Sequence, residues 1–536
     1  MVAPTGWNRA KKDDSTSTDS GEQTRGDTVA ESRPAGTAPT SSEPTPPSGT
    51  PGADPSAVTD PSAPTTAAER ANPANRSADF GIDTTARTTG EAIRGYVTGL
   101  RSGELGSLPA LLGLLALFIL FTLLDSGGTF PSLLNLANLL QQGAGPTIIA
   151  MGLVFVLLTG EIDLAAGTAS GLAAALMALH LVSGGNMLGA MGTLVFILLV
   201  AAMLIAAVLA VLVKVYAGAA VSVIAAVLLV VGFPQNAWLE MLLAVCIGVV
   251  IGCLTGFLIA KIGMPSFVVT LALFITWQGV ILQLIGDGGT LGLRDPVINA
   301  VANGNLSTVG SWVLFVLGAG GYAGVLLNRQ RSRLSKGLVA QPTGLVLIKV
   351  GAVVLLAAVA TFLLTRDRSP GTIVISGIPY VVPIVLVLLV LGTYVLDRTR
   401  FGRHVYAVGG NREAARRAGI DVVRIRAAVF VISSAFAAIG AIVYSSKVGS
   451  VSPAAGGGNT LLFAVGAAVI GGTSLFGGRG RVSNAVIGGA VLATVQNGLG
   501  LLKQPAAVVF VITGLVLLLA ASVDVLSRRK SAAAGR

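Results

Sequence analysis

Long apolar runs follow one another through most of this chain, and they constrain its fold more than any other feature. From Leu108 onward, only short polar stretches separate them. A helix of about 20 residues crosses the roughly 30 Å hydrocarbon core of a bilayer. Charged residues make up 11% of the chain, against about 25% in a typical soluble protein. The run lengths and the lack of strict alternation predict membrane helices and exclude a β-barrel.

Fourteen runs approach the length of a span, so we expect an all-α integral membrane protein with about 12–14 transmembrane helices. The two runs within 144–182 could also form one broken helix. The runs cover residues 108–124, 144–159, 162–182, 189–212, 215–233, 237–260, 267–285, 310–327, 347–364, 376–396, 425–444, 460–476, 482–502 and 506–526.

The first hundred residues have a different composition. Residues 1–100 contain 11 of the 23 prolines, 13 acidic and 9 basic residues, and no long apolar run. Such a segment cannot bury enough apolar surface to offset its chain entropy. We therefore expect a disordered, Pro/Ser/Thr/Ala-rich cytoplasmic tail at 1–100 and a transmembrane domain at 101–530.

Basic residues gather in a few loops, and they predict the topology. The loop 397–426 carries eight arginines. The loop 328–337 is also basic, and so are the segments that flank the apolar region on either side. Cytoplasmic loops of membrane proteins are enriched in Lys and Arg. Even numbers of spans separate these segments, which predicts that both termini are inside. The exceptions, expected outside, are Arg294, Arg366, Arg368, Lys447 and Lys503. The sequence pI near 10.0 therefore indicates topology, and no nucleic-acid partner is expected.

The inventory of reactive side chains is small. Cys246 and Cys253 lie seven residues apart in one apolar run, too far along a helix for a disulfide. His180 and His404 are the two histidines and lie far apart in sequence. We expect no metal site and no catalytic residues.

The arginine-rich loop contains a short predicted helix. Asn411 is a favourable N-cap, Glu413 would lie in the first turn, and Gly419 suits the position after the last turn. A helix of about seven residues is marginal alone in water, so it is expected to dock against another surface. From charge alone, a basic cytoplasmic loop that happens to be helical is an equally good interpretation.

Four stretches of this sequence resemble one protein family, in the same order along the chain. They are MGLVFVLLTGEIDLAAGTASG at 151–171, GMPSFVVTL at 263–271, GGNREAARRAGI at 409–420 and IGGTSLFGGRGR at 470–481. The chain is similar to the permease subunits of ABC sugar importers, in the ribose/xylose branch. The Glu-Ile-Asp-Leu segment resembles the xylose-type members most. Two segments have no counterpart in this pattern: the tail 1–100, and 185–235, which looks like an extra hydrophobic pair.

The resemblance implies a mechanism and a set of partners. The permease would carry a monosaccharide, such as the pentose xylose, across the cell membrane by alternating access. It would work as a homodimer with a separate ABC ATPase and an extracytoplasmic sugar-binding protein. No Walker A sequence occurs in the chain, so ATP and Mg would belong to the ATPase and no cofactor to this chain. The residues implied to seat in the ATPase are Gly410, Asn411, Glu413, Ala414, Ala415, Arg416 and Gly419.

Glu161 and Asp163 are the only carboxylates in the apolar stretch 144–182. A carboxylate at bilayer depth is costly and therefore indicates function. They could accept hydrogen bonds from sugar hydroxyls in the translocation path, or form a tight turn between two spans. Asn459 and Thr473 are further candidates for the path. Glu240, which opens another span, could line an outer mouth or simply lie at the interface.

Two other classes of protein must be weighed. An ion-coupled secondary transporter needs ion-binding groups within the membrane, and only Glu161, Asp163 and Glu240 would qualify. A membrane transferase needs clustered carboxylates or histidines at one membrane face, and the loops offer few. The glycine-rich stretch 471–481 lacks the spacing of a nucleotide-binding loop and is better explained as a turn between helices.

Overall fold

A computed structural model describes residue 90 and residues 107–286, 288–338, 340–369 and 371–534. The side chains of 520, 521 and 523–534 lie outside this description. The predicted disordered tail 1–100 therefore lies outside the described residues, except for Gly90. All the helices below belong to the compact unit formed by residues 81–536.

The described part of the chain is helical, with two strands of two residues each. The helices are α2 (Leu108–Leu124), α3 (Leu133–Leu158), α4 (Ala165–Val182), α5 (Met187–Met191), α6 (Thr193–Leu212), α7 (Tyr216–Val231), α8 (Ala237–Phe257), α9 (Ser266–Ile285), α10 (Pro296–Asn303), α11 (Thr308–Phe315), α12 (Gly321–Ser335), α13 (Thr343–Leu364), α14 (Val381–Arg398), α15 (Arg400–Gly410), α16 (Arg412–Arg417), α17 (Val422–Val448), α18 (Gly458–Ile470), α19 (Val482–Leu501) and α20 (Ala506–Ala534). Short π-helical turns, Leu258–Ile262 and Val316–Gly320, extend α8 and join α11 to α12.

The helix lengths confirm an all-α, polytopic membrane fold. Within the described residues, nine helices are long and apolar enough to cross a bilayer: 133–158, 165–182, 193–212, 237–262, 266–285, 308–335, 343–364, 381–398 and 422–448. Four shorter apolar helices lie at Leu108–Leu124, Tyr216–Val231, Gly458–Ile470 and Ala506–Leu519. The stretch 144–182 forms two helices, α3 and α4, with a turn between them.

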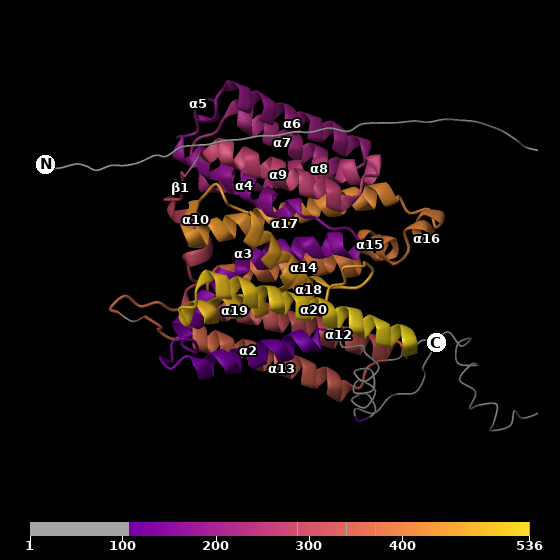
Figure 1. Ribbon diagram of the computed structural model, residues 1–536. Helices are drawn as coiled ribbons and strands as arrows, with labels where there is room; N and C mark the ends of the chain where they lie inside the picture. Colours follow the sequence, from indigo (N-terminus) through magenta and orange to yellow (C-terminus); the bar gives the residue numbers. More distant parts are fainter. Residues whose placement is uncertain (1–89, 91–106, 287, 339, 370, 535–536) are drawn as a thin grey trace, which may run out of the picture. The chain divides into compact units, whose positions relative to one another are not determined.

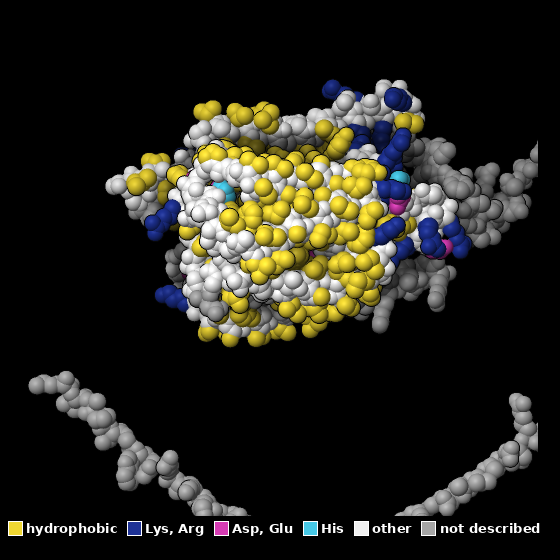
Figure 2. All heavy atoms as spheres, turned by 90° about the horizontal axis from the view of Figure 1, so that it is seen from above, with side chains coloured by type: hydrophobic (Ala, Val, Ile, Leu, Met, Phe, Trp, Pro, Cys, Tyr) yellow, Lys and Arg dark blue, Asp and Glu magenta, His cyan; other side chains and the backbone are white. Residues whose placement is uncertain are grey.

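The helices lie side by side along a common direction, so the bundle has two ends (Figure 1). We call them the α16 end, which carries α15 and α16, and the β1 end, which carries α10 and the strand β1 (Leu291–Gly292). At the β1 end, β1 pairs antiparallel with β2 (Ser450–Val451). Figure 2 shows that Lys and Arg side chains gather mainly at one end, while hydrophobic side chains cover the flank between the ends.

Glycines allow the central helices of the bundle to pack closely. In α8, a Cβ on Gly248 would lie 2.4 Å from the carbonyl oxygen of Ser434 in α17, and one on Gly252 would lie 2.6 Å from the Cα of Val431. Between α3 and α17, Gly145 and Gly440 approach each other's helices in the same way. Without side chains at these positions the backbones approach closely, which stabilises helix pairs in lipid.

α3 begins at Leu133, earlier than the predicted run at 144. Its first turns carry several Asn and Gln residues, which interrupt the apolar pattern. The Ser132 hydroxyl caps the helix by accepting a hydrogen bond from the Asn135 N–H. Inside the bundle, the side-chain amides of Asn135 and Asn497 pair at 2.8 and 2.9 Å. Hydrogen bonds to a distant helix therefore offset the cost of burying Asn135. The apolar pattern of the sequence does not reveal this partner.

Residues 452–457 connect β2 to α18 and pack deeply against α4. A Cβ on Gly171 would lie 2.0 Å from the carbonyl oxygen of Ala455, and one on Gly167 would lie 2.5 Å from that of Gly456. α18 has only 13 residues and starts at this contact. The spaced pair Gly167/Gly171 therefore makes room for a non-helical loop rather than for another helix.

The segment 185–235 forms the helices α5, α6 and α7, and α6 and α7 pack on α8. At the α16 end, the turn between α6 and α7 brings the Lys214 ammonium to 3.2 Å from the Asp421 carboxylate, which caps α17. At the β1 end, Gln235 donates a hydrogen bond to the Leu181 carbonyl. The helices α6 and α7 are thus attached to the rest of the bundle at both ends.

Candidate coupling and translocation sites

Two short helices, α15 and α16, project at the α16 end of the bundle (Figure 1). Asn411 separates them and caps α16, because its side-chain oxygen accepts a hydrogen bond from the Ala414 N–H at 2.9 Å. Gly419 follows α16 with a φ of +80°, a left-handed conformation that glycine adopts without strain. Both predicted helix boundaries are confirmed.

The side chains of α16 divide between the bundle and the outside. Ala415 is buried and belongs to the central hydrophobic cluster, whereas Ala414 and Gly410 are exposed. Glu413 is exposed and pairs with Arg416 at 2.7 Å and with Arg417 at 3.4 Å. The surface available to a partner is therefore Glu413, Ala414 and the arginines, and Ala415 anchors the helix from behind.

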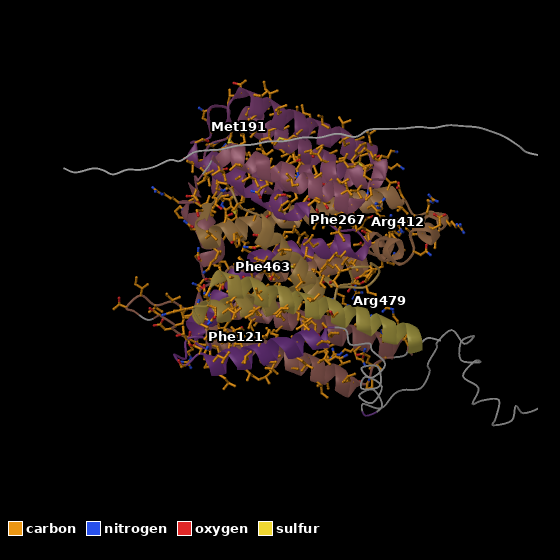
Figure 3. All side chains as sticks on the ribbon, in the orientation of Figure 1. Phe121, Met191, Phe267, Arg412, Phe463 and Arg479 are labelled. Atoms are coloured by element: carbon orange, nitrogen blue, oxygen red, sulfur yellow. The ribbon has the colours of Figure 1, made fainter. Side chains whose placement is uncertain are left out.

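Two segments far apart in sequence, the end of α3 and the stretch 478–480, meet beneath α15. The Gly478 N–H donates a hydrogen bond to the Leu158 carbonyl at 2.9 Å, and the Tyr406 hydroxyl donates one to the Gly480 carbonyl at 2.9 Å. Gly409 lies against the same Leu158 carbonyl, where an added Cβ would come within 1.7 Å. Figure 3 shows Arg412 and Arg479 toward the same end of the bundle. The glycine-rich stretch 471–481 is a turn that supports the short helices.

Glu161 ties α16 to the bundle. Its Oε1 lies 2.6 Å from a guanidinium nitrogen of Arg412, the first residue of α16, and 2.6 Å from one of Arg426 in α17. The Glu161 side chain is 6% exposed and that of Arg426 is 11% exposed. Two guanidinium groups thus neutralise one buried carboxylate. Neither partner of Glu161 was predicted from the sequence, although an arginine at position 426, just inside the predicted apolar run 425–444, is itself a signal.

Asp163 and Ile162 connect the same turn to three other helices. The Asp163 carboxylate accepts hydrogen bonds from the Ser433 hydroxyl of α17 at 2.9 Å and from the Ala166 N–H of α4 at 3.1 Å. The backbone of Ile162 bonds to Ser266 and Thr270 in α9, each at 3.3 Å. Glu161 and Asp163 therefore lie in a buried turn at the α16 end, where α3, α4, α9, α16 and α17 meet.

The other two path candidates lie at opposite ends of α18. Asn459 is exposed on the first turn of α18, directly after the loop that packs against α4. Thr473 follows the end of α18 and is 1% exposed, and its Oγ1 has no hydrogen-bond partner among the described residues. The structure brings Glu161 and Asp163 together, but it does not join Asn459 and Thr473 to them in one site.

Glu240 and His180 form a buried polar pair. The sequence had placed Glu240 at an outer mouth or at the membrane interface. Glu240 is 0% exposed and its Oε1 lies 2.6 Å from His180 Nδ1. The His180 ring stacks on Phe233 at a centroid distance of 4.0 Å. The start of α8 meets the end of α4 here, so Glu240 is covered by protein and does not line a mouth. Among the described residues, no group of three His, Cys, Asp or Glu could hold a metal ion.

Comparison with known proteins decides the family. Residues 215–521 match the family described as the permease component of the branched-chain amino acid transport system. The chain belongs to this permease family. It is thus a multi-pass membrane protein and the permease subunit of an ABC transporter, whose ATPase is a separate chain. This agrees with the resemblance noted from the sequence motifs.

Several curated proteins are similar to this permease over most of their length. The xylose transport system permease protein of Escherichia coli K12 is 30% identical over 437 residues, which cover 82% of this chain and 96% of that protein. The corresponding protein of Haemophilus influenzae is 29% identical over 418 residues, or 78% of this chain and 95% of its own length. The ribose import permease protein of Escherichia coli K12 is 27% identical over 412 residues, or 77% and 92%. No solved structure matches the chain.

Proposed function

We propose that this chain is the membrane-spanning subunit of an ATP-driven importer for a monosaccharide, of the xylose type. The similar proteins described above carry xylose and ribose in their names. One structural observation supports the coupling role most directly. α16 is capped, exposed on one side and attached on the other to a buried carboxylate that contacts α17. Such a helix can transmit a movement of the ATPase to the spans.

The proposed orientation places the α16 end in the cytoplasm, with both termini inside. At this end lie Arg412 and Arg479 (Figure 3), Lys214 beside the cap of α17, and the arginine-rich end of α12. The excess of basic residues favours the cytoplasmic side for this end. The sugar-binding protein would then dock at the β1 end.

The proposed assembly contains two copies of this permease and an ATPase that binds ATP and Mg. Sugar-loaded binding protein docks outside, ATP binding closes the ATPase, and α16 carries that closure into the bundle. The turn at 161–163 is the proposed route of transmission, because it contacts α16, α17, α4 and α9. The residues in contact with the ATPase would be Gly410, Asn411, Glu413, Ala414, Arg416 and Gly419, with Ala415 as their anchor.

Asn459 is the better supported of the remaining path candidates. Non-helical backbone at membrane depth is tolerated where it is buried in protein or lines a water-filled cavity. Residues 452–457 are such backbone, since they pack against Gly167 and Gly171 of α4. Asn459 is exposed just beyond them. Glu161 and Asp163 are already engaged with other side chains, which favours a structural role in transmission over contact with sugar.

Co-purification with the ATPase tests the coupling role. Ala414→Trp adds bulk to the exposed face of α16 and should abolish binding of the ATPase while the permease remains folded. Ser335→Trp, an exposed position at the end of α12, is the matched control and should retain the ATPase. Normal ATPase binding by the Ala414 variant would refute the assignment.

An uptake assay separates this proposal from an ion-coupled transporter. With ATP held constant, an uncoupler should leave sugar uptake intact. Collapse of uptake under these conditions would favour ion coupling. The two arginines on Glu161 argue against that alternative, because they neutralise the carboxylate that an ion would need.

A further inference from the structure

A polar cavity lies at the β1 end of the bundle, away from α15 and α16. Its volume is about 410 Å³, and residues of α3, the end of α10, the loop between α13 and α14, and the end of α17 line it. The polar lining includes Asn138, Gln141, Asn303, Asn305, Arg368 and Lys447. Binding sites for small molecules are concave and carry a few well-placed polar groups, so the chemistry of this lining can indicate a ligand.

Two cations in the cavity are held by neutral partners. Arg368 is 8% exposed. It donates hydrogen bonds to the Asn305 side-chain oxygen at 2.6 Å and to the carbonyls of Leu364 and Gly377 at 2.7 and 3.0 Å. The Lys447 ammonium donates one to the Gln141 side-chain oxygen at 2.7 Å. Neither cation forms an ion pair within the part of the chain that the structure describes.

The cavity therefore offers more donors than acceptors. Its lining contains no carboxylate. The carboxylate of the neighbouring Asp367 accepts hydrogen bonds from the Ser369 and Ile375 N–H groups instead. The Asn138 side chain is half-buried and makes no hydrogen bond to another described residue. Leu134 and Ala137 supply apolar surface beside these polar groups.

The position of the cations also needs an explanation. Arg368 and Lys447 lie at the end opposite the basic loops, where Lys and Arg are disfavoured. Their hydrogen bonds fix the guanidinium and ammonium groups in place, and among the described residues no carboxylate is within salt-bridge distance of either charge. Hydroxyl oxygens of a carbohydrate can accept hydrogen bonds from such donors, and sugar hydroxyls can donate to the amide oxygens. The C–H faces of a sugar ring can pack against the apolar surface of Leu134 and Ala137.

We propose that this cavity is a binding site for a neutral monosaccharide on the permease itself, at the face where the binding protein releases its cargo. The proposal rests on the proposed import function. It assigns part of the sugar selectivity to Asn138, Gln141 and Lys447.

Direct binding to the purified permease tests this site without the binding protein. The full chain in lipid nanodiscs is titrated with D-xylose by calorimetry. Saturable binding is expected, and Asn138→Leu and Gln141→Met should each raise the Kd by about tenfold or more, as expected when a site loses hydrogen bonds to its ligand. Gln283→Leu is the control, because Gln283 is an exposed amide in α9, outside the cavity lining, and its Kd should stay unchanged.

Three results would overturn the proposal. They are the absence of saturable binding of D-xylose and D-ribose, binding that both cavity variants leave unchanged, and tight binding of the sugar acid xylonate that D-xylose does not displace. The last result would identify an anion site. Retention of the ATPase and the thermal unfolding temperature are measured for each variant. If ATPase binding and ATP-driven uptake persist while no sugar binds, the cavity assignment fails and the proposed import function stands.

Discussion

The carboxylate of Glu161 lies 2.6 Å from the guanidinium of Arg412, although 251 residues separate them in the chain. The same oxygen atom contacts Arg426, so one buried acid joins the start of α16 to α17. Arg426 is buried, whereas the side chain of Arg412 is 49% exposed. Removing the acid from a buried charge pair leaves its partner without compensation, which is strongly destabilising. The Glu161 carboxylate is therefore a sensitive point of the junction between α16 and α17.

Glu161→Gln should lower the free energy of unfolding by about 3 kcal/mol, because the buried guanidinium group of Arg426 loses its anion. The substitution should also reduce the rate of ATP hydrolysis that sugar-loaded binding protein stimulates. Its effect on the binding of the ATPase to the permease should be smaller. Thermal unfolding in detergent and ATP hydrolysis by the reconstituted complex measure the two effects. Glu413→Gln is the control for the unfolding measurement, since Glu413 also pairs with two arginines but is exposed. Its cost in stability should be about 0.5 kcal/mol or less, and equal losses of stability for both variants would contradict the prediction.

Two adjacent glycines at the end of α15 should respond differently to alanine. A Cβ at position 409 would come within 1.7 Å of the Leu158 carbonyl, whereas one at 410 would meet no atom within 4 Å. Gly409→Ala must move the turn that Gly478 shares with Leu158, at a cost of about 3 kcal/mol. Gly410→Ala should be neutral. Thermal unfolding of the two purified variants gives the comparison, and similar values would show that the packing beneath α15 is loose.

The contact between α8 and α17 depends on small residues. Gly252→Leu should prevent the close approach to Val431 and cost about 3 kcal/mol or more. Gly351→Leu in α13 is the control, because a Cβ there would meet nothing within 4 Å. The yield of monodisperse protein in mild detergent and its unfolding temperature measure the effect. A control variant as unstable as the Gly252 variant would argue against specific packing at this position.

The Lys214–Asp421 pair should give a pH-dependent contribution to stability. Partial burial raises the pKa of Asp421, but the Arg424 N–H and the Lys214 ammonium outweigh it and hold the pKa below its ordinary value. A depressed pKa stabilises the folded state above the ordinary value of the acid, and this contribution disappears as pH falls through the folded-state pKa. Asp421→Asn keeps the helix cap and removes the charge. The difference in unfolding temperature between wild type and variant should be present near pH 7, begin to shrink near the ordinary pKa of about 4, and vanish only below the folded-state pKa of Asp421. A difference that grows toward acid would contradict this sign.

Local signals predicted several features correctly. Asn411 and Gly419 bound α16 as expected, because capping depends on hydrogen bonds and backbone angles within a few residues. Each of the fourteen apolar runs contains a helix, since the length of a span is fixed by the thickness of the hydrocarbon core, but the run 460–476 continues beyond the end of α18 at Ile470. The polar start of α3 did not follow from the same signal, because Asn135 finds its partner in α19.

The apolar runs by themselves determined that this chain is a bundle of membrane helices, because burying backbone polar groups in hydrocarbon requires helical hydrogen bonds. The motif around Asn411 also indicated the family of the chain. Like a helix cap, this motif consists of residues that are neighbours in sequence, so the sequence alone reveals it. Only the tertiary structure decided that Glu161 belongs to the α16 junction, and that Arg368 and Lys447 share one cavity. These side chains are brought together by packing between distant helices, and no local pattern records which helices become neighbours.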